Sequence, residues 1–258
     1  MTEPACAHHV LLADGTDLYY EIHGSGQPLL LLHGGGGAGV NWRLIFDFDA
    51  PPAGYQLIVP DLRGHGHSTN PSGRISFRQL ADDVVALLGH LAIARARMVG
   101  VSMGAKTLLH VATQRPERVH RMVLVSAAPY FPEATRAAMR QAAASPKTEA
   151  DWEMMRRWHV RGDEQIEKLW GMAGALAEEY EDLNFTPTQL GRITAPTLIV
   201  HGGRDWLYPT SLAMELHSAI PNSRLWVVPS GDHGPIFGSM AKPFAETALE
   251  FLNDTRGQ

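Results

Sequence analysis

The chain has 258 residues, of which 45% are hydrophobic and 19% are charged, and its formal net charge is −5 at pH 7. This composition is typical of one globular domain that buries a large core. The charge is spread without long basic runs and no apolar segment approaches the ~20 residues that span a bilayer, so we expect a cytoplasmic protein with no nucleic-acid or membrane partner.

The predicted elements alternate between short apolar strands and amphipathic helices. Residues 10–12 and 18–22, joined by a turn at 13–16, indicate an antiparallel hairpin at a sheet edge. Near-continuous apolar runs, which are typical of strands buried on both faces, follow at residues 29–32, 57–59, 98–99, 122–125, 198–200 and 225–228. Between them, leucines keep a helical period over residues 80–91 and 108–112. The alternation predicts an α/β fold with a mostly parallel sheet and crossover helices.

The strand pattern stops over residues 130–188, where tryptophan, methionine and charged residues keep a helical spacing. We expect a helical cap (lid) here, inserted into a core made of residues 1–129 and 189–258. The alternative is a set of ordinary packed surface helices.

The most informative motif is Gly100-Val101-Ser102-Met103-Gly104, between an apolar strand and a helical stretch. A serine on a sharp strand-to-helix turn needs small residues two positions to either side, and glycine removes the clash. The motif predicts a nucleophile elbow, with Ser102 as nucleophile and the amide of Met103 as a donor to an oxyanion.

A serine nucleophile needs a base, and the base needs an acid that holds its tautomer. Asp205 and His233 each follow a predicted strand, at the sheet edge where Ser102 is expected. The order Ser102, Asp205, His233 is that of a triad built from successive strand ends. Asp232 is the rival acid, but a neighbour in sequence rarely folds back onto the adjacent imidazole, so Asp205 is preferred.

A glycine run, residues 34–37, directly follows the strand at 29–32. A phosphate loop is excluded because no Lys-Ser/Thr follows, and a dinucleotide fingerprint fits poorly. We therefore predict that the amide of Gly35 joins that of Met103 in an oxyanion hole. Residues 61–68, which contain His65 and His67, are interpreted as a structural loop held by an Asp/Arg pair.

The single cysteine, Cys6, excludes an intramolecular disulfide and is interpreted as a spectator thiol. None of the thirteen histidines has the H-E-x-x-H spacing, and the pairs His8-His9 and His65-x-His67 lie beside turn residues. We expect no metal site.

Together, the segments at residues 32–35, 61–66, 100–104, 203–205 and 231–233 resemble the α/β-hydrolase superfamily over about residues 10–251. The resemblance implies an eight-stranded sheet with an antiparallel second strand, a lid after the sixth strand, no cofactor, and Ser102, Asp205 and His233 as nucleophile, acid and base. One departure is Asp232, at a place where relatives commonly have glycine. The glycine run is similar to carbon–carbon bond hydrolases, whereas the turn at 61–66 is similar to esterases and enol-lactone hydrolases.

The predicted function is hydrolysis of small to medium apolar or aromatic carboxylic esters, by a monomer or homodimer. Aromatic side chains near the motif ends or in the cap are expected to line the substrate pocket, namely Trp42, Tyr130, Phe131, Trp158, Trp206 and Phe237. Two alternatives remain open. The same triad would serve a lactonase or a carbon–carbon bond hydrolase of ring-cleavage products, and the same fold would serve a lyase or a ligand receptor.

Overall fold

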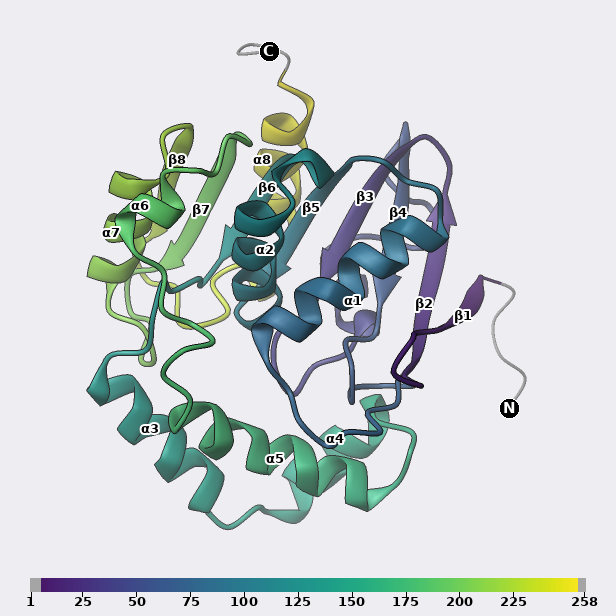
Figure 1. Ribbon diagram of the computed structural model, residues 1–258, viewed down its shortest axis with the longest axis vertical. Coiled ribbons are helices and arrows are strands. Elements are labelled where there is room, and N and C mark those ends of the chain that lie inside the picture. The colour runs from purple at the N-terminus through teal and green to yellow at the C-terminus, as the bar shows by residue number, and fades with distance from the viewer. Residues whose placement is uncertain (1–5, 255–258) are drawn as a thin grey trace.

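A computed structural model describes residues 6–254, and in them eight strands form one sheet (Figure 1). The strands are β1 (Ala7–Leu11), β2 (Asp17–Gly24), β3 (Gln27–Leu32), β4 (Tyr55–Pro60), β5 (Ala96–Val101), β6 (Val119–Val125), β7 (Thr197–Gly202) and β8 (Ser223–Val228). Their order across the sheet is β1-β2-β4-β3-β5-β6-β7-β8. β2 is antiparallel to β1 and β4, and the remaining pairs are parallel. The predicted mostly parallel eight-stranded sheet is confirmed.

Helices cover both faces of this sheet because the inner strands are apolar on both sides. The α-helices are α1 (Phe77–His90), α2 (Met103–Gln114), α3 (Glu133–Ala144), α4 (Glu149–Trp158), α5 (Asp163–Ala177), α6 (Pro187–Leu190), α7 (Thr210–Ala219) and α8 (Ala241–Asn253). Three short 3-10 helices are η1 (Gly39–Leu44), η2 (Pro116–Arg118) and η3 (Gly238–Met240). Residues of α1, α2 and α7 pack in one apolar cluster, and residues of η1 and α8 pack in the other.

The segment at residues 130–188, here called the helical insertion, leaves the sheet after β6 and returns before β7. Its helices α3, α4 and α5 lie together beyond one end of the strands (Figure 1). The two ends of the insertion run side by side, since Tyr130 and Asn184 form a β-bridge and the amide of Phe185 donates to the carbonyl of Pro129 at 2.9 Å. A buried arginine, Arg136, donates to the carbonyls of Phe131, Ala177 and Glu179 and so ties α3 to the end of α5.

Within residues 6–254, no helix combines enough length with enough apolar character to span a membrane. The core boundaries predicted at residues 1 and 258 lie outside the described residues.

Candidate active site

The predicted elbow has the expected backbone geometry. Ser102 sits between β5 and α2 with φ +49°, a conformation that L residues rarely adopt. A Cβ on Gly100 would lie 2.5 Å from the carbonyl carbon of Gly104, and one on Gly104 would lie 2.4 Å from the carbonyl oxygen of Leu32. The two glycines are therefore needed for the turn that lifts Ser102 out of the sheet.

Three side chains from separate loops meet at this turn. The Nε2 of His233 lies 2.9 Å from the Oγ of Ser102, and its Nδ1 lies 2.9 Å from a carboxylate oxygen of Asp205. The side chain of Asp205 is fully buried and also accepts from the amides of Leu207 and Tyr208. Burial acts to raise the pKa of Asp205, but the hydrogen bonds and the charge of His233 outweigh it and lower the pKa. The carboxylate is thus held ionised against the Nδ1–H of His233.

The loop that carries His233 is fixed by its main chain. Ser126, which follows β6, donates from its Oγ to the carbonyl of His233 at 2.8 Å. Asp232 accepts from the amide of Gly234 at 2.9 Å. The carboxylate that contacts His233 is therefore that of Asp205, as preferred from the sequence, and Asp232 closes a local turn.

The glycine loop (residues 33–37) lies against the start of α2. A Cβ on Gly35 would lie 3.3 Å from the Cε of Met103, so the two predicted oxyanion donors belong to adjacent segments. The backbone amides of Gly35 and Met103 have no hydrogen-bond partner within residues 6–254. Two free amides beside Ser102 are what an oxyanion requires.

Three buried histidines connect the glycine loop to neighbouring segments. The Nε2 of His33 accepts from the amide of Leu62 at 2.9 Å, and the Nε2 of His65 faces the amide of Gly36 at 3.4 Å. From the helical insertion, His159 donates to the carbonyl of Gly36 at 3.0 Å and accepts from the amide of Gly66. Burial lowers the pKa of all three, that of His33 to about 4. They are neutral hydrogen-bonding groups at pH 7.

The loop at residues 61–68 is structural, but the predicted Asp/Arg pair has different partners. Arg63 is buried and pairs with Asp83 of α1 and with Asp14 in the β1–β2 turn, both at 2.6 Å. Asp61 instead accepts from the amides of Gly39 and His67. The loop is thus held by two ion pairs of Arg63 with other elements, because its long side chain extends beyond the nearby Asp61.

The aromatic residues predicted to line a substrate pocket are only partly brought together. Trp42 is 2% exposed and packs on Phe46 in the cluster beneath η1. The prediction that it lines the substrate pocket is wrong, because a residue after the glycine loop folds back into the core. Phe131 is buried with its ring centroid 6.1 Å from that of Tyr208. Trp206 is exposed, with its ring 6.2 Å from that of His233.

The other three aromatic residues lie at different places. Tyr130 is at the hinge of the helical insertion, where its hydroxyl donates to Glu215 at 3.2 Å. Phe237 packs against the cluster that contains α8, and its ring would meet a Cβ on Gly234 at 3.1 Å. Trp158 is the last residue of α4 and is half-buried. These three residues therefore do not line one common pocket.

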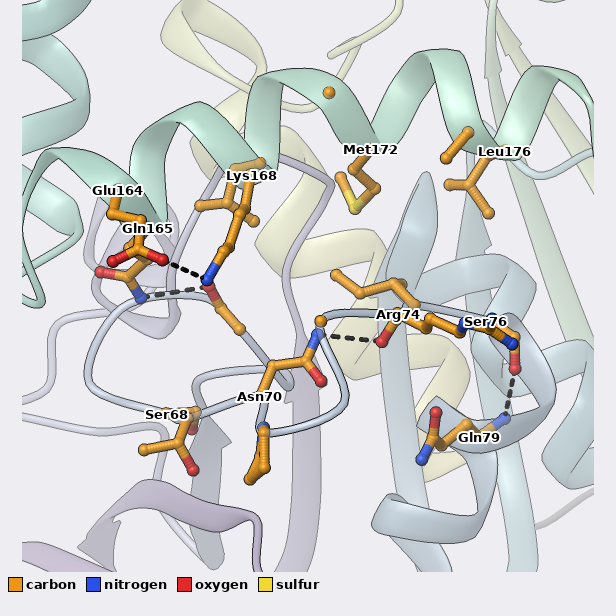
Figure 2. A pocket seen from close by; sticks show the side chains of 18 of the residues that line it. Ser68, Asn70, Arg74, Ser76, Gln79, Glu164, Gln165, Lys168, Met172 and Leu176 are labelled. Carbon is orange, nitrogen blue, oxygen red and sulfur yellow. Dashed lines mark hydrogen bonds and ion pairs between the residues drawn. The ribbon is translucent and has the colours of Figure 1, made fainter.

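A cavity of about 860 Å³ lies between α5 and the loop that precedes α1 (Figure 2). Met172 points into it from α5, as do Lys168 and Leu176, while Asn70 and Arg74 face them from the loop. None of the six predicted pocket residues lines it. The Cε of Met172 lies 3.3 Å from the Cβ position of Gly35, so this side chain stands between the cavity and the glycine loop.

Sequence reasoning missed a lysine beside the nucleophile. Lys106 of α2 is 2% exposed, and its Nζ lies 3.4 Å from the Oγ of Ser102 and 2.7 Å from the Oη of Tyr208. The available signal was a lone charged residue in the apolar helix that follows the elbow. His159 and Met172 were also missed, because their approach to the glycine loop depends on how the helical insertion folds.

One group of possible metal ligands occurs among the described residues, in the edge hairpin. It consists of Cys6, Glu21 and His23, whose ligand atoms lie within 4.8 Å of one another. Glu21 is already engaged by the Nε2 of His23 at 2.7 Å and by the hydroxyl of Tyr19. Cys6 and His23 belong to the edge of the sheet and not to the loops around Ser102.

Comparison with known proteins extends these observations. A family model described as the alpha/beta hydrolase fold matches residues 27–152. The chain is 28% identical to the AB hydrolase superfamily protein YisY of Bacillus subtilis, over 91% of this chain and 95% of that protein. It is 31% identical to a candidate non-heme chloroperoxidase of a Synechocystis species, over 84% of this chain and 88% of that protein.

A solved structure agrees over nearly the whole chain. An esterase from Exiguobacterium antarcticum has a TM-score of 0.78 and 25% identity to this chain, covering 95% of this chain and 99% of that one. The similar proteins carry the names of different reactions. Similarity of fold and sequence therefore does not identify one reaction. The reaction has to be inferred from the chemistry of the site.

Proposed function

This chain belongs to the α/β-hydrolase superfamily, and from that premise we propose that it hydrolyses carboxylic esters of small to medium apolar or aromatic substrates. One observation carries the proposal: an unbroken hydrogen-bond chain runs from the Oγ of Ser102 through His233 to the buried carboxylate of Asp205. Similarity to an esterase structure supports the choice of ester substrates.

The proposed mechanism has two halves. His233 takes the proton of Ser102 while Oγ attacks the acyl carbonyl, and Asp205 stabilises the imidazolium that forms. The amides of Gly35 and Met103 bind the oxyanion. His233 then protonates the leaving alcohol, and a water molecule, deprotonated by the same imidazole, releases the acid from Ser102.

We assign the cavity of Figure 2 to the substrate and the helical insertion to a cap that covers it. Two of its basic side chains are already paired, Lys168 with Glu164 at 2.7 Å and Arg161 with Asp17 at 3.8 Å. Ile75, Leu169 and Leu176 add apolar surface. This balance supports an uncharged substrate, and Arg74 is the group that would favour an anionic one.

The direct test is hydrolysis of a p-nitrophenyl ester chain-length panel by the protein and its Ser102→Ala variant, together with labelling by a neutral fluorophosphonate located by mass. We expect turnover that depends on Ser102, with the label on that residue and a loss of at least several orders of magnitude in the variant. Full activity of Ser102→Ala would refute the proposal, and a preference for strongly anionic esters would refute the substrate class.

The same experiment separates the alternatives. Labelling of Ser102 with slow ester turnover, but fast cleavage of a ring-cleavage dienoate or a lactone, would assign the triad to carbon–carbon bond or lactone hydrolysis. Ligand binding without turnover would point to a receptor or a lyase. The expectations of a cytoplasmic location and of a monomer or homodimer stay predictions.

A further inference from the structure

Lys106 is a buried cation-forming group for which the triad mechanism has no use. It lies one helical turn after Ser102, and no ion pair found within residues 6–254 includes it. Its Nζ reaches two oxygens, the Oη of Tyr208 at 2.7 Å and the Oγ of Ser102 at 3.4 Å. An amine buried without a carboxylate partner is costly, so its position beside the nucleophile calls for a reason.

Aromatic rings surround this amine. Its Nζ lies 4.8 Å from the ring centre of Tyr208 and 5.4 Å from those of Phe77 and Phe131. Ring faces attract an ammonium group and thus favour the charged form. Burial acts in the other direction and lowers the pKa of Lys106 to about 7, against the attraction of Asp205. The group therefore changes charge close to neutral pH.

The direction of the hydrogen bond to Ser102 follows from the triad. The Nδ1 of His233 faces the carboxylate of Asp205 and so carries the proton, which leaves Nε2 as an acceptor. The hydroxyl proton of Ser102 points to that Nε2, at 2.9 Å. The lone pairs of Oγ remain for another donor, and Lys106 is positioned to donate to them.

We propose that Lys106 is a fourth catalytic side chain, whose ammonium form donates a hydrogen bond to the Oγ of Ser102 and stabilises the negative charge that Oγ acquires during the reaction. This inference rests on the proposed role of Ser102 as nucleophile. Charge develops on Oγ twice, when His233 removes its proton during attack and when the bond from Oγ to the acyl carbon breaks. His233 carries the proton in both steps, and Lys106 keeps its own.

Other ionisable groups face Lys106 from the elements packed around it. The loop after β7 contributes Asp205, whose pKa is lowered, and Tyr208, whose pKa is raised by burial. The loop after β8 contributes His233, which must be neutral to act as a base. The segment after β6 and α1 contribute the rings of Phe131 and Phe77, and the guanidinium carbon of Arg136 lies 5.7 Å from the centre of the Phe131 ring.

The test is the pH dependence of Ser102 phosphonylation by a neutral fluorophosphonate, measured from pH 5.5 to 9.5. The rate of the wild-type protein should fall by about ten- to a hundredfold as the pH rises and Lys106 loses its proton, because a charged donor to Oγ is lost. Lys106→Met should be slower by that factor near pH 6.5 and should lack the fall. Lys242→Met, at an exposed side chain of α8, is the matched control and should behave as wild type.

Two more variants sharpen the test. Lys106→Arg keeps a cation at every pH tested, so part of the rate should return without the alkaline fall. Tyr208→Phe removes the oxygen that accepts from Nζ, so the fall should move to lower pH. Thermal unfolding of each variant reports its fold, and the wild-type profile is decisive by itself if Lys106→Met does not fold.

Each contrary result has one meaning. A wild-type rate that stays flat up to pH 9.5, or Lys106→Met with the wild-type rate and profile, would overturn the role of Lys106. A rate that rises above pH 7 in the wild type but not in Lys106→Met would also overturn it, since the neutral amine would then act as a base. Absence of label on Ser102 would instead refute the proposed function.

Discussion

The loops around Ser102 and the helical insertion differ in how they are built. At Ser102, each side chain follows a strand of one sheet, and backbone contacts such as the bond from Ser126 to His233 fix its place. The insertion contacts the site through single side chains, His159 and Met172, from helices outside the sheet. The triad is thus placed on loops at the strand ends, while the substrate cavity is shared with helices that lie outside the sheet.

The largest expected effect lies at the triad. Asp205→Asn keeps the size of the side chain but removes the charge that holds the Nδ1–H tautomer of His233, so kcat should fall roughly 10⁴-fold, as in other triads. Asp232→Asn is the matched control, because Asp232 only closes a turn with Gly234. Steady-state ester hydrolysis measures both, and equal losses in the two variants would show that the acid was assigned wrongly.

The two regions also differ in how well the sequence predicts them. Ser102, Asp205 and His233 were predictable because each lies at a strand end within a few residues of glycines, so local geometry determines their place. The residues that line the substrate cavity were not predictable from the sequence. Trp42 turns into the core, and the cavity is lined by residues of α5 and of the loop before α1. Those contacts depend on packing between segments about a hundred residues apart, which no local pattern encodes.

The same substitution should have opposite effects in the two regions. A Cβ on Gly104 would lie 2.4 Å from the carbonyl oxygen of Leu32, so Gly104→Ala should destabilise the protein by about 3 kcal/mol or more. A Cβ on Gly171, inside α5, meets nothing within 4 Å, so Gly171→Ala should stabilise by roughly 0.5–1 kcal/mol through helix propensity. Urea unfolding gives both values. A loss of stability in Gly171→Ala would mean that α5 is packed as tightly as the core.

Low pH should destabilise the protein through His33, the buried histidine at the start of the glycine loop. The pKa of His33 is about 4 in the folded protein and about 6.5 in the unfolded chain, so its contribution to stability is complete above pH 6.5 and is lost as the pH falls towards 4. The loss is about 3 kcal/mol for this residue. Urea unfolding of the wild-type protein and of His33→Asn at pH 7.5 and 4.5 measures it. The variant should lose less stability than the wild type between the two pH values, and equal losses would contradict the assignment.

The smallest expected effect concerns Met172, where the two regions meet. Its Cε lies next to Gly35 while its side chain lines the cavity, so Met172→Ala should open the passage between the glycine loop and the cavity (Figure 2). We expect the preferred ester chain to lengthen, with a several-fold change in the ratio of kcat/KM between long and short esters, because one buried methylene is worth only about 1 kcal/mol. Met154→Ala, on an exposed part of α4, is the control and should leave the ratio unchanged. An unchanged ratio in Met172→Ala would place the acyl chain outside this cavity and leave the triad assignment untouched.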